Sequence, residues 1–400
     1  MNVFATLGCR IFQKGLYLAS LFLPFRLPEE IEGAAALAAK LGEMGLHKPL
    51  LVTDRSLHAL GMEKKFLEAF KARGLDSALF YEVDPNPTFS MVEKGYAVYR
   101  GEGCDCLVAL GGGSAMDAAK TLSIRIAYPR KDLASFKGIL KVHRKLVPLF
   151  AIPTTAGTGS ETTLAAVIIN DATRDKFQID DPKLIPLGAV FDPTLLGGLP
   201  PHIIASTGMD ALTHAVESFI GHSNYPKTKK DALEAIRLIH EHLLPFYKMP
   251  RDEIQARAMQ RAAFLAGAAF TRSYVGYVHA LAHSLGGTYN VPHGLANAVL
   301  LPHVLKAYGK SVYGRLAYLS DMLGLLDKTR SKKEKAEAFI SYVEELNATM
   351  GIPDGFENLV KEEDIVALAR HAAKEGNPLY PVPKTMNAKE LEIVLRSSLK

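Results

Sequence analysis

Three histidines lie close together in the second half of the chain. His279, His283 and His293 fall within the stretch YVHALAHSLGGTYNVPH. The spacing of four between the first two places both rings on one face of a helix. We expect the glycine pair 286–287 to end that helix and the turn at 292–294 to bring back the third imidazole. Three converging imidazoles favour a bound metal ion, and ordinary polar helix positions are the alternative.

A second stretch, STGMDALTHAVE, supplies a carboxylate and another imidazole. Asp210 and His214 are also four residues apart, and Ser206 or Thr207 is expected to cap the start of their helix. Two such helices would present one carboxylate and two or three imidazoles to a single ion. This set suits Fe(II) or Zn(II) and contains too much nitrogen for magnesium or calcium.

The segments GMDALTHAVES, YVHALAHSLGG and VPHGLANAVLLPHV together are similar to the iron-containing (group III) alcohol dehydrogenase family. Matching motifs run from about residue 51 to residue 383. The resemblance implies that the metal ligands are Asp210, His214, His279 and His293. It implies a catalytic place for His283, beside the metal and near the reacting carbon.

Two loops in the first half of the chain are candidate cofactor sites. The glycine run 111–113 and Ser114 follow an apolar strand and precede a helix, whose amide groups can bind an anion. The run matches neither GxGxxG nor a Walker loop, and a helix cap formed by Ser114 and Asp117 is the alternative. The second loop, PTTAGTGSE at 153–161, is rich in hydroxyl groups.

The same resemblance implies that these two loops hold NAD(P). The residues expected to contact the cofactor are Gly112, Gly113, Ser114, Asp117, Thr154, Thr155, Thr158, Lys176 and, near the adenosine end, Asn86. Asp54 ends a predicted strand, where a carboxylate can accept ribose hydroxyl bonds and repel a 2′-phosphate. We therefore predict NAD(H) in preference to NADP(H), with a loop-capping role for Asp54 as the alternative.

Four residues are assigned to the substrate pocket. Leu164, Ala165 and Phe270 align with pocket positions of the family. Arg272 precedes His279 by two helical turns, so both would point along one face. Its guanidinium would then bind an anionic or polyhydroxylated aldehyde. The alternative is an arginine that reaches solvent or pairs with a neighbouring acid.

The resemblance and the ligand set imply a metal-dependent, NAD(P)-linked alcohol dehydrogenase or aldehyde reductase. Hydride would pass between nicotinamide C4 and a primary alcohol or aldehyde, in a cleft between two domains. Alternatives are a dehydrogenase of a hydroxy acid, semialdehyde or polyol, or a dehydroquinate-forming relative. A metal- and nucleotide-binding protein without turnover is a further alternative.

The elements that must position these residues fall into two halves. Strands are predicted at 49–53, 78–83, 106–110, 147–152 and 189–191, with helices at 30–45, 62–73 and 91–100. This alternation indicates a parallel α/β sheet. After residue 200 helical periods dominate. We predict an α/β dinucleotide-binding domain at 1–200 and an all-helical metal-binding domain at 201–400, as in the dehydroquinate synthase-like fold that the resemblance implies.

The composition bounds the possible partners and location. Four hundred residues suit two domains, and the net charge of +5 is dispersed, which argues against a nucleic-acid-binding face. Cys104 and Cys106 are interpreted as core residues. Three cysteines in all indicate no disulfide framework and a reducing compartment, so we predict a cytoplasmic protein. We expect a small-molecule substrate and a homodimer or higher homo-oligomer.

The first 26 residues are apolar and need a separate interpretation. Arg10 and Lys14 precede the apolar run 16–24, which loosely imitates a signal peptide. The run is shorter than the roughly 18 to 20 residues of a membrane span. We expect an amphipathic helix that packs on the body of the protein or on a partner subunit. A membrane-surface role is the alternative.

Overall fold

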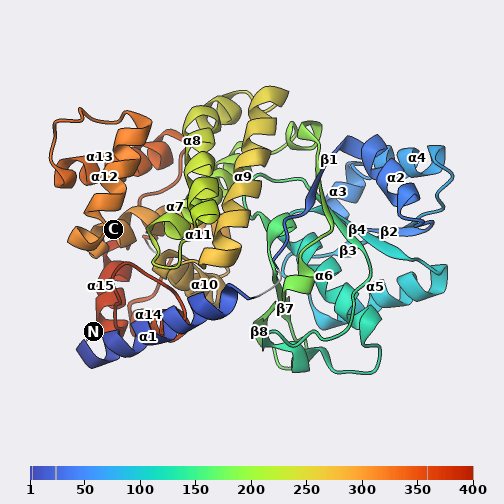
Figure 1. Ribbon diagram of the computed structural model, residues 1–400, viewed down its shortest axis with the longest axis horizontal. Coiled ribbons are helices and arrows are strands. Elements are labelled where there is room, and N and C mark those ends of the chain that lie inside the picture. The colour runs from blue at the N-terminus through green and yellow to red at the C-terminus, as the bar shows by residue number, and fades with distance from the viewer. Residues whose placement is uncertain (2, 23–24, 358, 400) are drawn as a thin grey trace. The chain divides into compact units, whose positions relative to one another are not determined.

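The computed structural model describes residues 1, 3–22, 25–357 and 359–399. It contains two compact units, Pro24–Gly197 and Met1–Leu23 with Gly198–Lys400 (Figure 1). The first unit ends at residue 197, where the sequence predicted 200. The structure differs from the predicted division in grouping the N-terminal helix with the second unit.

The first unit is built on a six-stranded sheet in which every strand pairing is parallel, with the order β1-β9-β6-β4-β2-β3. All residues of β4 are buried, as expected for a strand covered on both faces. The strands are β1 (Glu29–Glu32), β2 (Pro49–Asp54), β3 (Ala78–Val83), β4 (Cys106–Gly111), β6 (Leu149–Pro153) and β9 (Gly188–Phe191). The predicted parallel α/β sheet is therefore confirmed.

Helices connect these strands at the predicted places, with one correction. They are α2 (Gly33–Glu43), α3 (Arg55–Ala59), α4 (Lys64–Ala72), α5 (Phe89–Glu102) and α6 (Gly113–Ala127). The prediction of a helix from residue 30 was wrong, because Glu29–Glu32 forms the edge strand β1. In that strand only Ile31 is buried, and it pairs with Val190 of β9.

A second, smaller sheet was not predicted. It consists of β5 (Gly138–Ile139), β7 (Ala165–Ile169) and β8 (Lys176–Asp180) in the order β5-β8-β7. Strands β7 and β8 are antiparallel. Short 3-10 helices in this unit are η1 (Leu133–Phe136), η2 (Ser160–Thr162), η3 (Pro182–Leu184) and η4 (Pro193–Leu196).

The second unit is helical, as predicted. Its helices are α1 (Val3–Ser20), α7 (Pro201–Ile220), α8 (Pro226–Lys248), α9 (Glu253–Ser273), α10 (Tyr277–Tyr289), α11 (His293–Tyr308), η5 (Gly309–Ser311), α12 (Tyr313–Leu323), α13 (Lys332–Thr349), η6 (Glu362–Asp364), α14 (Ile365–Gly376) and α15 (Ala388–Ser397). Helices α7, α8 and α9 pack against one another. An apolar stripe of α8 that includes Ala232, Ile236 and Leu243 is buried.

Helix α1 is attached to the second unit by polar contacts. Arg10 donates to the carbonyl oxygens of Val382 and Pro383 at 2.6 and 3.0 Å. Gln13 donates to the carbonyl oxygen of Tyr380 at 2.6 Å. The expected packing of an N-terminal helix on the body of the protein is thus confirmed, whereas residues 23 and 24 of the apolar run lie outside the described residues. Within the described chain, no helix has the length and hydropathy needed to cross a membrane.

Candidate metal centre and cofactor loops

Four predicted metal ligands converge in the second unit. One ligand atom from each of Asp210, His214, His279 and His293 lies within 4.8 Å of the other three. Asp210, His214 and His279 are buried, and His293 is half-buried. The sequence spacing correctly predicted which residues share a helix, and the packing of α11 against α7 and α10 brings the four ligand atoms together.

A close approach of two helices places His293 beside Asp210. A Cβ atom on Gly294 would lie only 2.5 Å from the carbonyl oxygen of Ser206, so this position requires glycine. The first turn of α11 therefore contacts α7 directly. As a result, Nε2 of His293 lies 3.6 Å from Oδ1 of Asp210.

The predicted ends of these helices were wrong in two respects. Helix α10 continues through the glycine pair 286–287 and ends at Asn290, which has a left-handed backbone with φ of 58°. Ser206 and Thr207 do not cap α7, because the helix begins earlier, at Pro201. Their hydroxyl groups instead donate to the carbonyl oxygen of Ile203.

His279 is oriented by a buried carboxylate that the sequence analysis did not single out. Nδ1 of His279 lies 2.6 Å from Oε2 of Glu217, which also accepts from the amide of Gly276 at 2.8 Å. Burial raises the pKa of Glu217 to about 7. Burial and the neighbouring imidazoles hold the pKa of His279 well below its usual value, so its ring is neutral. A proton on Nδ1 then leaves the lone pair of Nε2 directed at the centre of the cluster.

The contacts of Asn297 show that the ligand atoms face one point. Its Nδ2 lies 2.7 Å from Oδ1 of Asp210 and 3.1 Å from Nε2 of both His279 and His293. Three acceptor atoms thus surround one position, while the buried Oδ1 of Asn297 has no hydrogen-bond partner. Such convergence of lone pairs fits a divalent cation. The only sequence signal for Asn297 was its spacing of four from His293 in an apolar helix.

His283 lies beside this cluster without joining it. Its ring centroid is 5.2 Å from that of His293, and Nδ1 lies 2.7 Å from Oε1 of Glu375. The hydroxyl of Tyr380 donates to the same carboxylate oxygen at 2.7 Å. Burial opposes ionisation of Glu375, but its interaction with His283 and the hydrogen bonds from His283 and Tyr380 outweigh burial and lower the pKa of Glu375. A charged Glu375 therefore fixes the ring of His283.

The two predicted substrate residues of α9 occupy different surroundings. The ring of Phe270 stacks on that of His214, with a centroid distance of 4.1 Å. The guanidinium of Arg272 lies 4.5 Å from the ring centroid of Tyr225. The spacing argument that placed Arg272 and His279 on one helix face was wrong, because the chain leaves helical conformation between α9 and α10.

In the first unit, predicted cofactor residues follow three neighbouring parallel strands. Asp54 ends β2, Gly111 ends β4, and the 153–161 loop begins at the end of β6. The carboxyl ends of adjacent parallel strands share one edge of the sheet, which is where such sheets bind ligands. Oδ1 of Asp54 accepts from the amide of Leu57 at 2.9 Å, so this residue also caps α3.

The glycine run and the second loop face each other. Gly111 has φ of 153°, and a Cβ atom there would lie 2.6 Å from that of Ala115. Thr155 and Thr158 are the side chains nearest to Gly112 and Gly113. The N-cap residue of α6 is Gly112, so the predicted alternative of a cap by Ser114 and Asp117 was wrong. The first amide groups of α6 therefore remain suited to an anion.

Asp117 and Lys120 join α6 to the second loop. Asp117 accepts from the hydroxyl of Ser160 at 3.2 Å and from the amide of Val167 at 3.1 Å, and burial raises its pKa to about 6. Lys120 is fully buried and was not singled out from the sequence. A separate hydrogen bond links Thr154 to the glycine run, because the amide of Thr154 donates to the carbonyl oxygen of Gly111 at 3.1 Å.

The remaining predicted residues lie on or near the small sheet. Nζ of Lys176 donates to Oδ1 of Asn86 at 2.7 Å, so two separately predicted cofactor residues are in contact. Leu164 and Ala165 are half-buried where the chain enters β7. The structure is therefore compatible with the predicted cofactor role of Lys176 and Asn86 and the predicted substrate role of Leu164 and Ala165.

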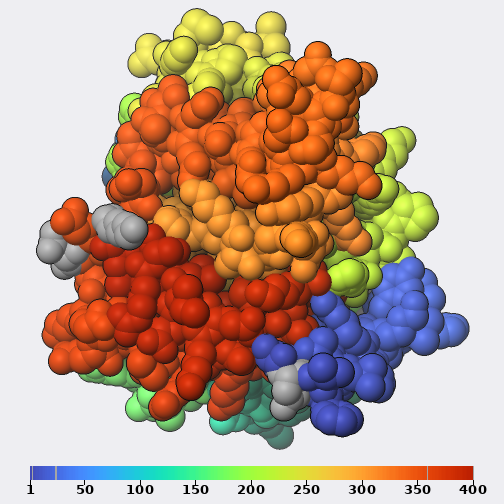
Figure 2. Space-filling view, turned by 90° about the vertical axis from the view of Figure 1, so that its left-hand side faces the viewer, coloured from blue at the N-terminus to red at the C-terminus, as the bar shows by residue number. Residues whose placement is uncertain are grey.

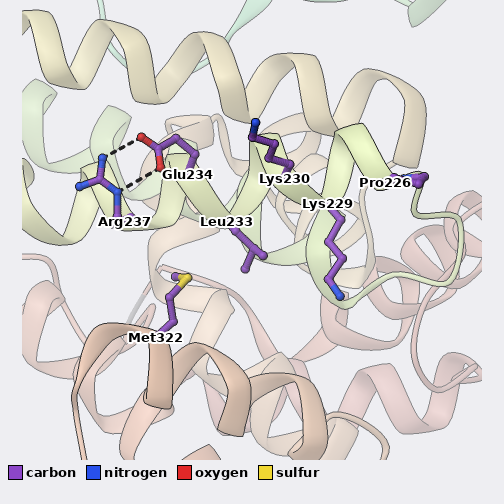
Figure 3. A pocket seen from close by; sticks show the side chains of 7 residues that line it. All are labelled: Pro226, Lys229, Lys230, Leu233, Glu234, Arg237 and Met322. Atoms are coloured by element: carbon purple, nitrogen blue, oxygen red, sulfur yellow. Dashed lines mark hydrogen bonds and ion pairs between the residues drawn. The ribbon is translucent and has the colours of Figure 1, made fainter.

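A surface hollow of about 360 Å³ lies on α8 and α12 of the second unit (Figure 3). Glu234 and Arg237 form an ion pair on its wall at 2.7 Å. Its lining residues are Pro226, Lys229, Lys230, Leu233, Glu234, Arg237 and Met322. Because it contains none of the predicted site residues, we assign it no role in the reaction.

The first unit has a parallel sheet with loops suited to binding an anion, and the second has a carboxylate–imidazole cluster suited to a divalent metal ion. Together these features indicate a metal-dependent, dinucleotide-linked oxidoreductase. Comparison with known proteins agrees with this class. The model for "Iron-containing alcohol dehydrogenase" matches residues 30–193, and that for "Fe-containing alcohol dehydrogenase family, C-terminal" matches residues 204–399. The chain belongs to the iron-containing alcohol dehydrogenase family, and it is an oxidoreductase that acts on alcohols or aldehydes.

Three relatives illustrate the similarity. The chain is 36% identical to the NAD-dependent methanol dehydrogenase of Bacillus methanolicus, over 90% of this chain and 94% of the relative. It is 39% identical to the 1,3-propanediol dehydrogenase of Citrobacter freundii, over 89% and 92%. The crystal structure of a 1,3-propanediol oxidoreductase superposes with a TM-score of 0.91 at 36% identity, covering 94% of this chain and all of that one. The family and its NAD-dependent members support a metal ion and NAD as cofactors.

Proposed function

We propose that the chain interconverts primary alcohols and aldehydes with NAD(H), using Fe(II) held by Asp210, His214, His279 and His293. The observation that carries this proposal is the convergence of the four ligand atoms within 4.8 Å. One carboxylate and three imidazoles suit borderline divalent ions, so Zn(II) is the competing metal. The family to which the chain belongs favours iron.

The residues of the chain have separate tasks in this reaction. When bound, the divalent ion supplies Lewis-acid stabilisation of negative charge on the substrate oxygen. Glu217 holds His279 in the tautomer that directs Nε2 toward the ion. Glu375 holds the Nδ1 proton of His283, which leaves Nε2 of that ring able to accept the alcohol proton and pass it to solvent.

The cofactor loops would hold NAD(H) along the carboxyl edge of the sheet. We assign pyrophosphate binding to the glycine run and the start of α6, and contacts with the rest of the cofactor to the threonines of the second loop, Lys176 and Asn86. When bound, oxidised NAD would supply nicotinamide C4 as the acceptor for the hydride of the alcohol carbon, and the hydroxyl proton would leave separately. NADP(H) is the competing cofactor, and Asp54 is the residue expected to disfavour it.

Three of the four predicted substrate residues are apolar. Leu164, Ala165 and Phe270 offer apolar side chains, and Phe270 already contacts the metal ligand His214. The contact between Arg272 and Tyr225 favours a structural role for the guanidinium. We therefore propose a neutral primary alcohol or aldehyde, rather than a hydroxy acid, semialdehyde or polyol.

We further propose a cytoplasmic enzyme that forms a homodimer or higher homo-oligomer. The support for the compartment is cysteine chemistry: Cys9, Cys104 and Cys106 are all free and buried, as in proteins of reducing compartments. The support for the oligomer is the general tendency of metabolic enzymes to form closed homo-oligomers. Light scattering of the purified chain would measure its assembly directly.

The ligand assignment is tested by metal content measured together with activity. His279→Ala and His293→Ala should each lose bound metal and NADH-dependent aldehyde reduction, because each removes one of four ligands. His283→Ala is the matched control, and it should retain stoichiometric metal while its kcat falls about 100-fold or more. Elemental analysis that found stoichiometric metal in His293→Ala would show the ligand set to be wrong.

A further inference from the structure

Helix α1 is oriented with its polar side toward the protein. Gln13 is 4% exposed, and Arg10 and Gln13 donate to backbone carbonyls of the segment that follows α14. Tyr17 stacks on Tyr225 with a ring-centroid distance of 4.7 Å. Cys9 is the other buried residue of the helix. These contacts fix which face of α1 points outward.

The outward face of α1 is apolar, which reverses the usual arrangement of a surface helix. Phe4 is 87% exposed and Ile11 is 65% exposed. The large apolar side chains exposed on α1 and just after it are Val3, Phe4, Leu7, Ile11, Phe12, Leu18, Leu21 and Phe22. Figure 2 shows α1, in blue, at the edge of the face formed by the red C-terminal segment. An exposed apolar face of this kind marks an interaction surface.

Exposed cations accompany this stripe. Helix α1 contains no acidic residue, and its Lys14 is exposed. Tyr225, on which α1 rests, immediately precedes the first turns of α8, where Lys229 and Lys230 are exposed and Lys227 pairs with Asp231 at 3.1 Å. At the N-terminal end of α1, the acidic residue Glu390 forms ion pairs with the amino group of Met1 and with Lys384. The surroundings of the apolar stripe therefore favour an anionic partner.

We propose that the outward face of α1 binds the surface of an anionic lipid bilayer. An apolar face with cations beside it is the pattern of a helix that lies in the membrane interface, with its apolar side among the acyl chains. The polar contacts of Arg10 and Gln13 keep the helix flat on the protein, so the whole stripe can enter the interface at once. The family match begins at residue 30, so α1 lies outside the segments that the family models match.

A second copy of the chain is the competing occupant of this face. The cations beside the stripe favour a bilayer, because a single amphipathic helix with an exposed apolar face and neighbouring cations is sufficient for binding in the membrane interface.

Co-sedimentation of the purified full chain with lipid vesicles tests the proposal. The chain should sediment with vesicles that contain phosphatidylglycerol and more weakly with pure phosphatidylcholine vesicles. The double variant Phe4→Ser with Ile11→Ser should bind the anionic vesicles at least about tenfold more weakly. Lys14→Gln should weaken binding to the anionic vesicles about fivefold, with no change on neutral vesicles.

The matched control is the double variant Leu60→Ser with Ile254→Ser, because both side chains are more than two-thirds exposed and neither belongs to α1. It should bind vesicles as the unmutated chain does, and all variants should keep the same Tm in buffer. The proposal is overturned if the unmutated chain fails to sediment with anionic vesicles, or if both double variants bind equally. A change of molar mass by light scattering in Phe4→Ser with Ile11→Ser, without a change in vesicle binding, would instead show a second copy on this face.

Discussion

At the scale of single residues, two histidines near the metal centre contact carboxylates that differ in burial. Glu217 is buried behind His279, whereas Glu375 is shared by His283 and Tyr380. The buried pair fixes a ligand, and the more exposed pair holds a ring that lies outside the ligand set. This difference supports a metal-binding role for His279 and a proton-transfer role for His283.

The first prediction at this scale concerns Asp54 and cofactor choice. Asp54→Asn keeps an oxygen that can cap α3 but removes the charge that would repel a 2′-phosphate. The ratio of kcat/KM with NADH to kcat/KM with NADPH should therefore fall about tenfold. Asp54→Gly should lower the ratio as well, and it should also lower Tm through loss of the cap. Equal kcat/KM for the two cofactors in the unmutated protein would contradict the prediction.

A second prediction at this scale concerns Arg272. Because its guanidinium stacks on Tyr225, Arg272→Ala should reduce the free energy of unfolding by about 0.5–1 kcal/mol. It should change kcat/KM equally for a semialdehyde and for the neutral aldehyde of equal length. Arg272→Lys is the control that retains the positive charge while losing the planar stacking group. A selective loss of tenfold or more for the charged substrate in Arg272→Ala would establish anion binding instead.

At the scale of elements, one buried lysine connects α6 with the loop that follows β6. Nζ of Lys120 donates to the carbonyl oxygens of Ser160, Thr163 and Ala165 at 2.8, 3.0 and 2.8 Å. It also contacts the hydroxyls of Ser160 and Thr163 at 3.1 and 2.8 Å. A fully buried lysine is uncommon, and here its hydrogen bonds hold the hydroxyl-rich loop against the start of α6.

We therefore expect Lys120→Met to weaken both the fold and cofactor binding. The substitution leaves three buried carbonyl groups without their donor, which should lower the free energy of unfolding by about 2 kcal/mol or more. The Kd for NADH should rise, because the loop that carries the threonines loses its attachment. Lys71→Met, at an exposed position of α4, should change neither quantity. Denaturant unfolding and NADH fluorescence titration measure the two effects, and an unchanged Kd would separate Lys120 from the cofactor site.

At the scale of the whole molecule, both units bury carboxyl groups whose pKa values are raised. Burial raises the pKa of Asp117 and Asp180 to about 6 and that of Glu161 and Glu217 to about 7. At these four carboxyl groups the folded chain therefore binds more protons than the unfolded chain between about pH 4 and pH 7. The stability contributed by these groups is complete below their unfolded pKa values and is lost as the pH rises through the folded ones.

The whole-molecule prediction concerns this pH dependence. In Glu161→Gln, the decrease in stability between pH 5 and pH 8 should be smaller than in the unmutated chain by about 1–3 kcal/mol, because glutamine cannot ionise. Glu68→Gln, at an exposed position of α4, is the control and should leave the pH profile unchanged. Unfolding curves at the two pH values provide the comparison. A profile for Glu161→Gln that matched the unmutated chain would mean that Glu161 remains ionised in the folded state.

The sequence by itself determined the features that depend on neighbours along the chain. A continuous apolar run predicted β4 and the glycine turn that ends it, because a strand buried on both faces has no polar alternation. A spacing of four predicted that Asp210 and His214 share a helix face, as do His279 and His283. Residue types alone then limited the bound ion to a borderline divalent metal.

The tertiary structure decided the contacts between residues that are distant in sequence. Glu217 precedes His279 by 62 residues, and Glu375 follows His283 by 92. Neither carboxylate belongs to the local pattern of its histidine. Arg272 and His279 are close in sequence, yet the break between α9 and α10 gives them different surroundings. Periodicity describes the face of one element, whereas the partner of that face is chosen by packing between elements, which a local pattern does not contain.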